Sequence, residues 1–168
     1  MKNLLSLLTA ASLTVNALSQ LPGTALMTTS AGVLISESKL TPERANEIPM
    51  RVVRHFVTTH GNAEEVSWAR VSNGSVVYFK EDGIDTKMAY KTNGQPSYLL
   101  RFYKENRMPE AIRRQVKSKY FDYSIFMIIE VLANDQTIYL VKMEDKDSYK
   151  TVRVCDGEMK VVENLKKG

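Results

Sequence analysis

Residues 48–60 read IPMRVVRHFVTTH and residues 108–120 read MPEAIRRQVKSKY, so two similar stretches recur within the chain. Each begins with an apolar residue followed by proline, which is favoured at a helix start. Apolar residues then recur at spacings of three and four, as they do on the buried side of an amphipathic helix. We therefore predict a helix in each stretch, ending near His60 and near Tyr120.

Runs of strand-forming residues follow each predicted helix and are separated by turn signals. Asn73-Gly74, Asp82-Gly83 and Asn93-Gly94 favour hairpin turns, because two-residue turns need positive φ at both central positions. The run Ile125–Ile129 is apolar on both faces, which predicts a strand in the middle of a sheet. The expected strands are near 64–72, 75–81, 84–91, 95–103, 124–133, 136–144, 149–155 and 158–163.

The repeated order of elements predicts an α+β fold with two tandem modules, each an α-ββββ unit. Placing Pro49 opposite Pro109 also places Phe56 opposite Val116. We expect a first module at residues 48–104 and a second at residues 105–168. Together they would form one curved antiparallel sheet with both helices on one face.

The N-terminus has the features of a secretory signal peptide at residues 1–19. A short positive region precedes the mainly apolar run Leu4–Leu18, and small residues allow cleavage before Leu18 or Gln20. A membrane anchor is the alternative, but the run is shorter than the roughly 20 residues that a spanning helix needs. We expect a periplasmic or secreted protein without stable membrane insertion, in which residues 20–47 form a linker or N-terminal arm.

Charge and cysteine content exclude two broad classes of protein. The net charge is +4, but 23 basic residues are scattered among 19 acidic ones, so the sequence shows no basic face and nucleic-acid binding is not expected. Cys155 is the only cysteine, so the fold depends on core packing rather than on an internal disulfide. Asp156 would raise the pKa of this thiol, which favours a strand residue over a reactive group.

Catalytic and metal-binding patterns are weak in this chain. His55 and His60 are the only histidines, and a spacing of five residues puts them on different faces of a helix. Asp145 and Asp147 lack the glycine and terminal glutamate of a calcium loop and are better interpreted as turn residues. We predict no catalytic residue, no cofactor and no metal site, and therefore no enzyme.

The sheet face opposite the helices is the predicted binding surface. Strand residues there alternate with the apolar residues that would face the helices, and they include charged groups rather than a second apolar set. Aromatic side chains could add the anchors that exposed ion pairs do not provide. The candidate binding residues are Asp85, Lys87, Lys91, Tyr98, Tyr149, Thr151 and Arg153.

These residues favour non-covalent recognition of an extracytoplasmic protein or peptide. The alternative is a periplasmic small-ligand-binding protein, in which the sheet and residues 20–40 would enclose an apolar cavity. A shallow face with charged and aromatic residues would indicate the first, and an enclosed apolar cavity of roughly 300 Å³ or more would indicate the second.

The order of elements resembles the exported PepSY-like family, whose fold is similar to that of the beta-lactamase inhibitory protein. The resemblance covers about residues 46–165 and implies a non-enzymatic periplasmic or secreted protein. That inhibitor has disulfides in each half, which a chain with one cysteine cannot form, so inhibition of a beta-lactamase is an analogy of fold alone. The residues that carry the resemblance are Ile48-Pro49, Met108-Pro109, Trp68, Tyr78-Phe79, Tyr139–Lys142, Asn93-Gly94 and Asp156-Gly157.

Overall fold

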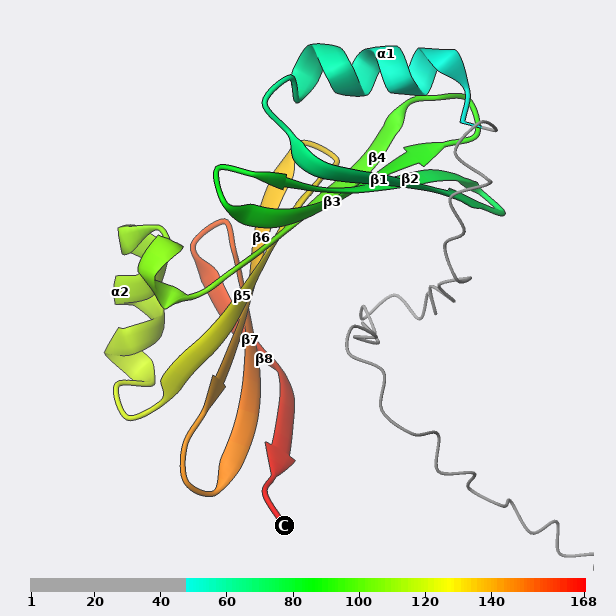
Figure 1. The fold of residues 1–168 in the computed structure, drawn as a ribbon. Coiled ribbons are helices and arrows are strands. Elements are labelled where there is room, and N and C mark those ends of the chain that lie inside the picture. Colours follow the sequence, from blue (N-terminus) through cyan, green and yellow to red (C-terminus); the bar gives the residue numbers. More distant parts are fainter. Residues whose placement is uncertain (1–47) are drawn as a thin grey trace, which may run out of the picture. The chain divides into compact units, whose positions relative to one another are not determined.

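The computed structural model describes residues 48–168, and the expectations for residues 1–47 lie outside this range. Its element order is helix, four strands, helix, four strands, with one short 3₁₀ turn before the second helix (Figure 1). The elements are α1 (Met50–Thr59), β1 (Glu64–Val71), β2 (Gly74–Glu81), β3 (Ile84–Lys91), β4 (Pro96–Tyr103), η2 (Glu105–Arg107), α2 (Glu110–Lys119), β5 (Ser124–Ala133), β6 (Gln136–Glu144), β7 (Ser148–Cys155) and β8 (Glu158–Lys166).

The two α-helices begin and end in the same way. Pro49 and Pro109 stand just before them with nearly equal backbone angles, φ −58° and ψ 131° against φ −54° and ψ 132°. At the other end, the backbone N–H of His60 donates to Phe56, as that of Tyr120 does to Val116. Both predicted helices are therefore confirmed to within about one residue at each end.

The eight strands of residues 48–168 form one antiparallel sheet in sequence order, β1 to β8. β4 pairs with β5, from Leu99 opposite Leu132 to Tyr103 opposite Ile128, and this pairing joins the first four strands to the last four. β5 lies inside the sheet, as its two apolar faces predicted.

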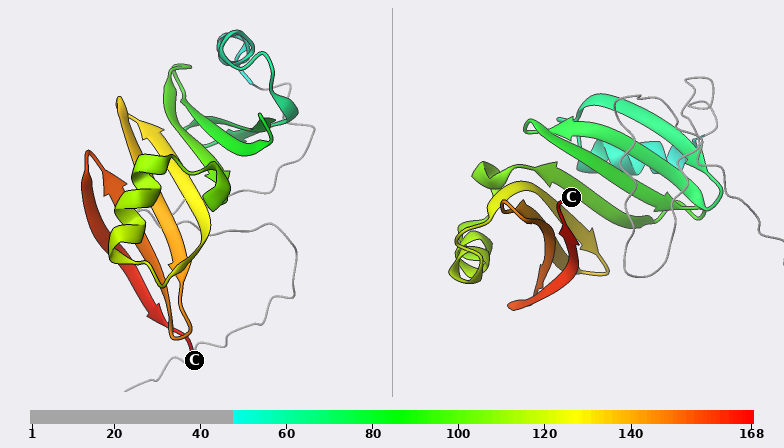
Figure 2. Two further views of the ribbon diagram at one scale, coloured as in Figure 1. Left: turned by 90° about the vertical axis from the view of Figure 1, so that its left-hand side faces the viewer. Right: turned by 90° about the horizontal axis from the view of Figure 1, so that it is seen from below.

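Alternation along β4 shows which face of the sheet the helices cover. Leu99 packs against the core cluster under α1, whereas Tyr103 belongs to the cluster under α2. These two residues are four positions apart in one strand, so their side chains point to the same face. Both helices therefore pack on one face of the sheet, which the views in Figures 1 and 2 also show.

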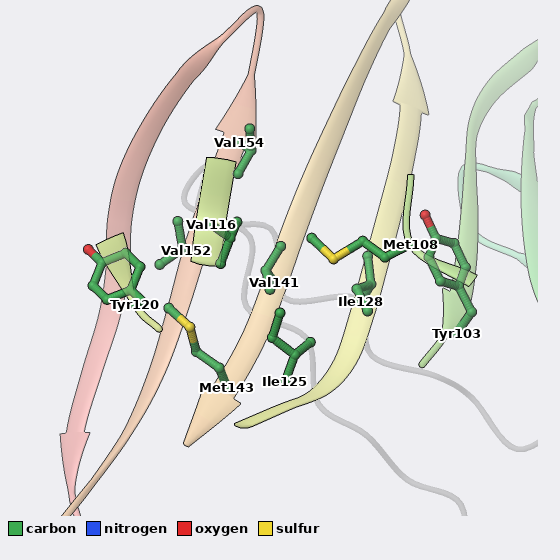
Figure 3. Packing of buried hydrophobic residues seen from close by; sticks show 10 residues of the cluster. All are labelled: Tyr103, Met108, Val116, Tyr120, Ile125, Ile128, Val141, Met143, Val152 and Val154. Atoms are coloured by element: carbon green, nitrogen blue, oxygen red, sulfur yellow. The ribbon is translucent and has the colours of Figure 1, made fainter. Parts of the chain in front are cut away.

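Two of the three core clusters, the larger ones, lie on this helix-covered face. Val52 and Phe56 of α1 pack with the first strands, and Val116 of α2, followed by Tyr120, packs with the last four (Figure 3). The first cluster contains Ile48, Val52, Phe56, Val77, Phe79, Met88 and Tyr90. The second contains Tyr103, Met108, Val116, Tyr120, Ile125, Ile128, Val141, Met143, Val152 and Val154.

The turns follow the expected chemistry only in part. Asp82-Gly83 and Asp156-Gly157 have positive φ at both positions, as predicted for two-residue turns. Gly74, by contrast, already belongs to β2 and pairs with β3. A Cβ added to Gly74 would lie 1.8 Å from the backbone oxygen of Tyr90, and its φ is 146°, so glycine is needed there for close backbone approach and for its backbone conformation.

Candidate binding surface

The face opposite the two helices, which we call the open face, carries all seven candidate binding residues. Cross-strand pairs share a face, and Asp85 pairs with Phe102 while Arg153 pairs with Leu140. Met88 and Val152, which alternate with the candidates, lie instead in the core under the helices. The residues of β3 and β7 therefore alternate between the helix-covered face and the open face, as predicted.

Two candidates differ from the expectation of an exposed surface. The side chain of Lys87 is only 7% exposed and that of Thr151 only 6%. The Nζ of Lys87 lies 5.1 Å from the ring centroid of Tyr78, and the hydroxyl of Thr151 donates to Glu163 at 2.7 Å. Neighbouring strands cover both groups, so neither offers its side chain freely to a partner.

β3 also departs from the prediction of a strand with one buried face. Thr86 to Tyr90 are all buried, so the strand is covered on the open face as well as on the helix-covered face. Small residues pack together there, and Ala89 contacts the cluster of Ala69 and Val76.

The remaining candidates are accessible but dispersed. Asp85 and Lys91 are exposed, Tyr98 and Arg153 are half-buried, and Tyr149 is 43% exposed. Asp85 and Arg153 lie in one row across the sheet, four strand positions apart, which corresponds to about 19 Å. They do not form a single contact site, and their role in binding stays a prediction.

The structure adds a group of apolar residues between these charges, which the sequence prediction missed. The row from Asp85 to Arg153 passes through Phe102, Ile129 and Leu140. The next row, which consists of Leu100, Val131 and Ile138, is also apolar and lies in the same three strands. We call this group the apolar band; it contains Leu100, Phe102, Ile129, Val131, Ile138 and Leu140.

The apolar band corrects the expectation that the open face lacks a second apolar set. Ile129 is 2% exposed, and the other five residues are half-buried. Neither helix of residues 48–168 covers this face, since both pack on the opposite side. β4, β5 and β6 therefore carry apolar residues on both faces. The sequence signal for this was the continuous apolar runs within the three strands.

An exposed apolar corner continues the band toward one end of β5. Phe126 and Tyr149 meet with their rings nearly perpendicular and their centroids 6.3 Å apart. Tyr149 also pairs with Leu165 of β8 and has the Nζ of Lys167 4.6 Å from its ring. The exposed fractions are 41% for Phe126, 38% for Met127, 43% for Tyr149 and 54% for Leu165. Aromatic residues often supply the anchors of a protein interface.

Two surface hollows among the described residues are open to solvent and include charged residues in their linings. The hollow of about 280 Å³ opens beside β2 and β3, and half of its eight lining residues are charged: Glu65, Lys80, Asp85 and Lys87. The other, of about 490 Å³, lies near Tyr123 and includes four lysines. Neither is the enclosed apolar cavity that the small-ligand alternative predicted.

A polar network on the helix-covered face uses one of the two histidines. His60 Nδ1 lies 3.0 Å from Glu81, and Arg101 lies between Glu81 and Glu130 at 3.8 and 3.9 Å. The hydroxyl of Tyr103 donates to Glu130 at 3.2 Å, and burial together with the negative charge of Glu130 raises the pKa of Tyr103. The network extends from β2 to β5 and connects the two halves of the sheet by ion pairs.

His55 and Cys155, the other side chains considered for reactivity, contact neighbouring residues of the fold. His55 Nδ1 lies 3.1 Å from the hydroxyl of Tyr90, whose pKa is raised to about 12 by burial. Cys155 is a buried free cysteine, and burial raises the pKa of its thiol. Within residues 48–168, no group of three potential ligands is placed to hold a metal ion, and no helix is long and apolar enough to cross a membrane.

Comparison with known proteins identifies solved structures that have a similar fold. No family model matches the chain, and no curated protein sequence matches it. Among solved structures, a BLIP-like protein (BF1215) from Bacteroides fragilis NCTC 9343 superposes with a TM-score of 0.59 and 13% identity, over 72% of this chain and 89% of that one.

Two further solved structures superpose comparably. A DUF2874 family protein from Bacteroides ovatus ATCC 8483 gives a TM-score of 0.58 and 16% identity, over 71% of this chain and 87% of that one. A candidate periplasmic protein from Bacteroides eggerthii DSM 20697 gives 0.57 and 14%, over 71% and 88%. The chain has the α+β fold of these proteins, a BLIP-like antiparallel sheet with two helices.

Proposed function

We propose that this chain is an exported, non-enzymatic binding protein that recognises an extracytoplasmic protein or peptide through the open face of its sheet. The observation that carries the proposal is the apolar band, together with the exposed corner around Phe126. Contiguous exposed apolar surface with a polar rim is characteristic of interaction sites.

Several features support a macromolecular partner rather than a small ligand. The apolar surface extends across three strands instead of closing into a cavity, and the two hollows described above are open and include charged residues. Asp85 and Arg153 flank the band in one row, which gives the surface a charged rim on both sides. The likeness of fold to a BLIP-like protein also favours a protein partner.

The proposal includes the finer organisation predicted from sequence. Residues 1–19 act as a cleaved signal peptide, and the mature chain works in the periplasm or outside the cell. Two PepSY-like modules, residues 48–104 and 105–168, both contribute to the binding surface, the second more than the first. The similarity of fold to a candidate periplasmic protein supports this location.

The test replaces one aromatic residue of the exposed corner. Phe126→Ala removes a 41% exposed ring from the open face, and we expect capture of an envelope partner to fall at least about tenfold, as for a central interface aromatic. Capture is measured by quantitative mass spectrometry after pull-down from an extract of the native cell envelope.

Phe121→Ala is the matched control. Phe121 is 80% exposed and lies in the turn after α2 rather than on a strand of the open face, so its loss should leave capture unchanged. Both variants should retain the melting temperature of the parent to within a few degrees. Equal capture by the parent and both variants would contradict the proposal.

A further inference from the structure

β8 is an edge strand with one unpaired side. It pairs with β7 over its whole length, and within residues 48–168 no strand pairs with its other edge (Figure 2). Its nine residues are almost all exposed, including Val161 at 39%, Val162 at 43% and Leu165 at 54%. An edge with free backbone N–H and C=O groups is a template for pairing with another strand.

The opposite edge of the sheet is less suited to pairing. Both edge strands contain a register shift, but the one in β1 includes Glu65, whose φ of 53° lies outside the extended region. The carboxylate of Glu65 is already paired with Lys80 at 2.8 Å. In β8, by contrast, no residue has positive φ, so the strand is extended from Glu158 to Lys166.

A bulge in β8 determines which of its residues share a face. Val161 pairs with Val152 and Glu163 pairs with Thr151, so Val162 is an extra residue between them. Because the alternation shifts at Val162, Lys160 and Glu163 both point to the open face although they are three positions apart. In a regular strand, residues at this spacing would point to opposite faces.

This shift makes β8 complementary to itself. A two-fold axis between Val161 and Val162 would place Lys160 of one copy opposite Glu163 of the other, twice in each dimer. Met159 would face Asn164 and Glu158 would face Leu165, and the members of each pair share a face. Opposite residues of an antiparallel pair must do so.

The charges within one copy favour the same arrangement. On β7, the residue opposite Lys160 is Arg153, so two cations stand side by side on the open face. Like charges in directly opposite positions are destabilising. The carboxylate of Glu163 from a second copy would supply the missing negative charge beside Lys160. We propose that two copies of this chain associate through antiparallel pairing of their β8 strands, with Lys160 opposite Glu163 at two symmetric positions.

A charge-reversal series on the full chain tests the pairing. Sedimentation equilibrium should show a reversible dimer for the parent. Lys160→Glu places two carboxylates opposite each other at both positions and should weaken the dimer roughly tenfold. The double variant Lys160→Glu with Glu163→Lys restores both pairs in reverse and should recover the affinity to within about a factor of two. Lys104→Glu, outside the strands, is the control for net charge.

Cysteine pairing tests the register. Opposite residues of an antiparallel pair have Cα atoms about 4.5–5.5 Å apart, within the range of a disulfide. An equimolar mixture of Lys160→Cys and Glu163→Cys chains should therefore form a mixed disulfide. Each variant alone should form far less, because identical positions would lie three residues apart along the pair, about 10 Å.

A parent that stays monomeric would overturn the proposal, as would a dimer that Lys160→Glu leaves intact or that the double variant fails to restore. Preferential homodisulfides of Lys160→Cys would overturn the register. The dimer is measured without a partner protein, so its outcome is distinguishable from partner capture through Phe126, which lies on β5, three strands away from β8.

Discussion

Asp145 holds the connection between β6 and β7 by accepting several hydrogen bonds. Its Oδ1 accepts from the backbone N–H of Asp147 at 2.9 Å, and from the N–H and hydroxyl of Ser148 at 2.6 and 3.0 Å. Burial works to raise the pKa of Asp145, but hydrogen bonds from Tyr123, Asp147 and Ser148 outweigh it and lower the pKa to about 2. The charged form is thus favoured in the folded state.

This lowered pKa predicts a specific acid sensitivity. A carboxyl group whose folded pKa lies below its unfolded value of 3.8 adds stability above that pH, and the stability is lost as pH falls toward 2. We expect Asp145→Asn to be less stable than the parent at neutral pH and to lose less stability between about pH 4 and pH 2. Urea unfolding midpoints across this range measure the difference.

Asp147→Asn is the control, since Asp147 contributes its backbone N–H rather than its carboxylate to the loop. It should keep the pH dependence of the parent. Parallel pH profiles for the parent and Asp145→Asn would show that the carboxylate of Asp145 is not held in its charged form.

At the residue scale, turn chemistry was predictable and burial was not. Asp145 and Asp147 lie in a turn as the sequence indicated, because Asp side chains bond to nearby backbone N–H groups whatever the tertiary structure. The burial of Lys87 depends on Tyr78 and Leu100, its cross-strand neighbours from β2 and β4. Periodicity within β3 gives no information about which residues lie opposite.

At the scale of elements, the strand and helix positions came from local signals. Proline before each helix and glycine or aspartate in the hairpins act within a few residues, so the bounds agree closely. The apolar band was missed because a continuous apolar run shows no alternation from which to assign faces. Only the register of β4, β5 and β6 shows that Leu100, Val131 and Ile138 form one row.

Methionines in different elements allow a matched test of core packing. Met143 of β6 has no exposed surface and lies in the cluster under α2, whereas Met50 of α1 is 69% exposed. Met143→Ala should lower the free energy of unfolding by about 2–5 kcal/mol through lost burial and the cavity left behind. Met50→Ala should change it by less than about 0.5 kcal/mol. Chemical denaturation followed by circular dichroism measures both, and equal effects would contradict the packing described here.

At the scale of the whole molecule, one sheet and one ion-pair network cross from the first four strands to the last four. β4 and β5 share a five-residue ladder, and Arg101 of β4 lies near both Glu81 and Glu130. The two core clusters therefore pack on one continuous sheet, and unfolding of either half of the sheet would expose the core of the other half. Such coupling predicts a single cooperative unfolding transition.

Trp68 provides a reporter for this coupling because it is the only tryptophan. It lies beside Phe56 in the cluster under α1, at a ring centroid distance of 5.2 Å, whereas Met143 lies in the cluster under α2. Met143→Ala should shift the unfolding midpoint seen by Trp68 fluorescence as much as the midpoint seen by circular dichroism. A Trp68 transition that stays in place would mean that the two halves unfold independently.

The sequential order of the strands also affects how the chain folds. Every strand pairs with the one made just before it, so most contacts are local, and domains with local contacts fold faster than those with distant pairings. The longest loop to be closed is residues 104–123, between β4 and β5, and the entropy cost of closing a loop grows only slowly with its length. A chain that emerges from its N-terminal end can therefore add strands one at a time, and each new strand serves as the template for the next until β8 completes the series.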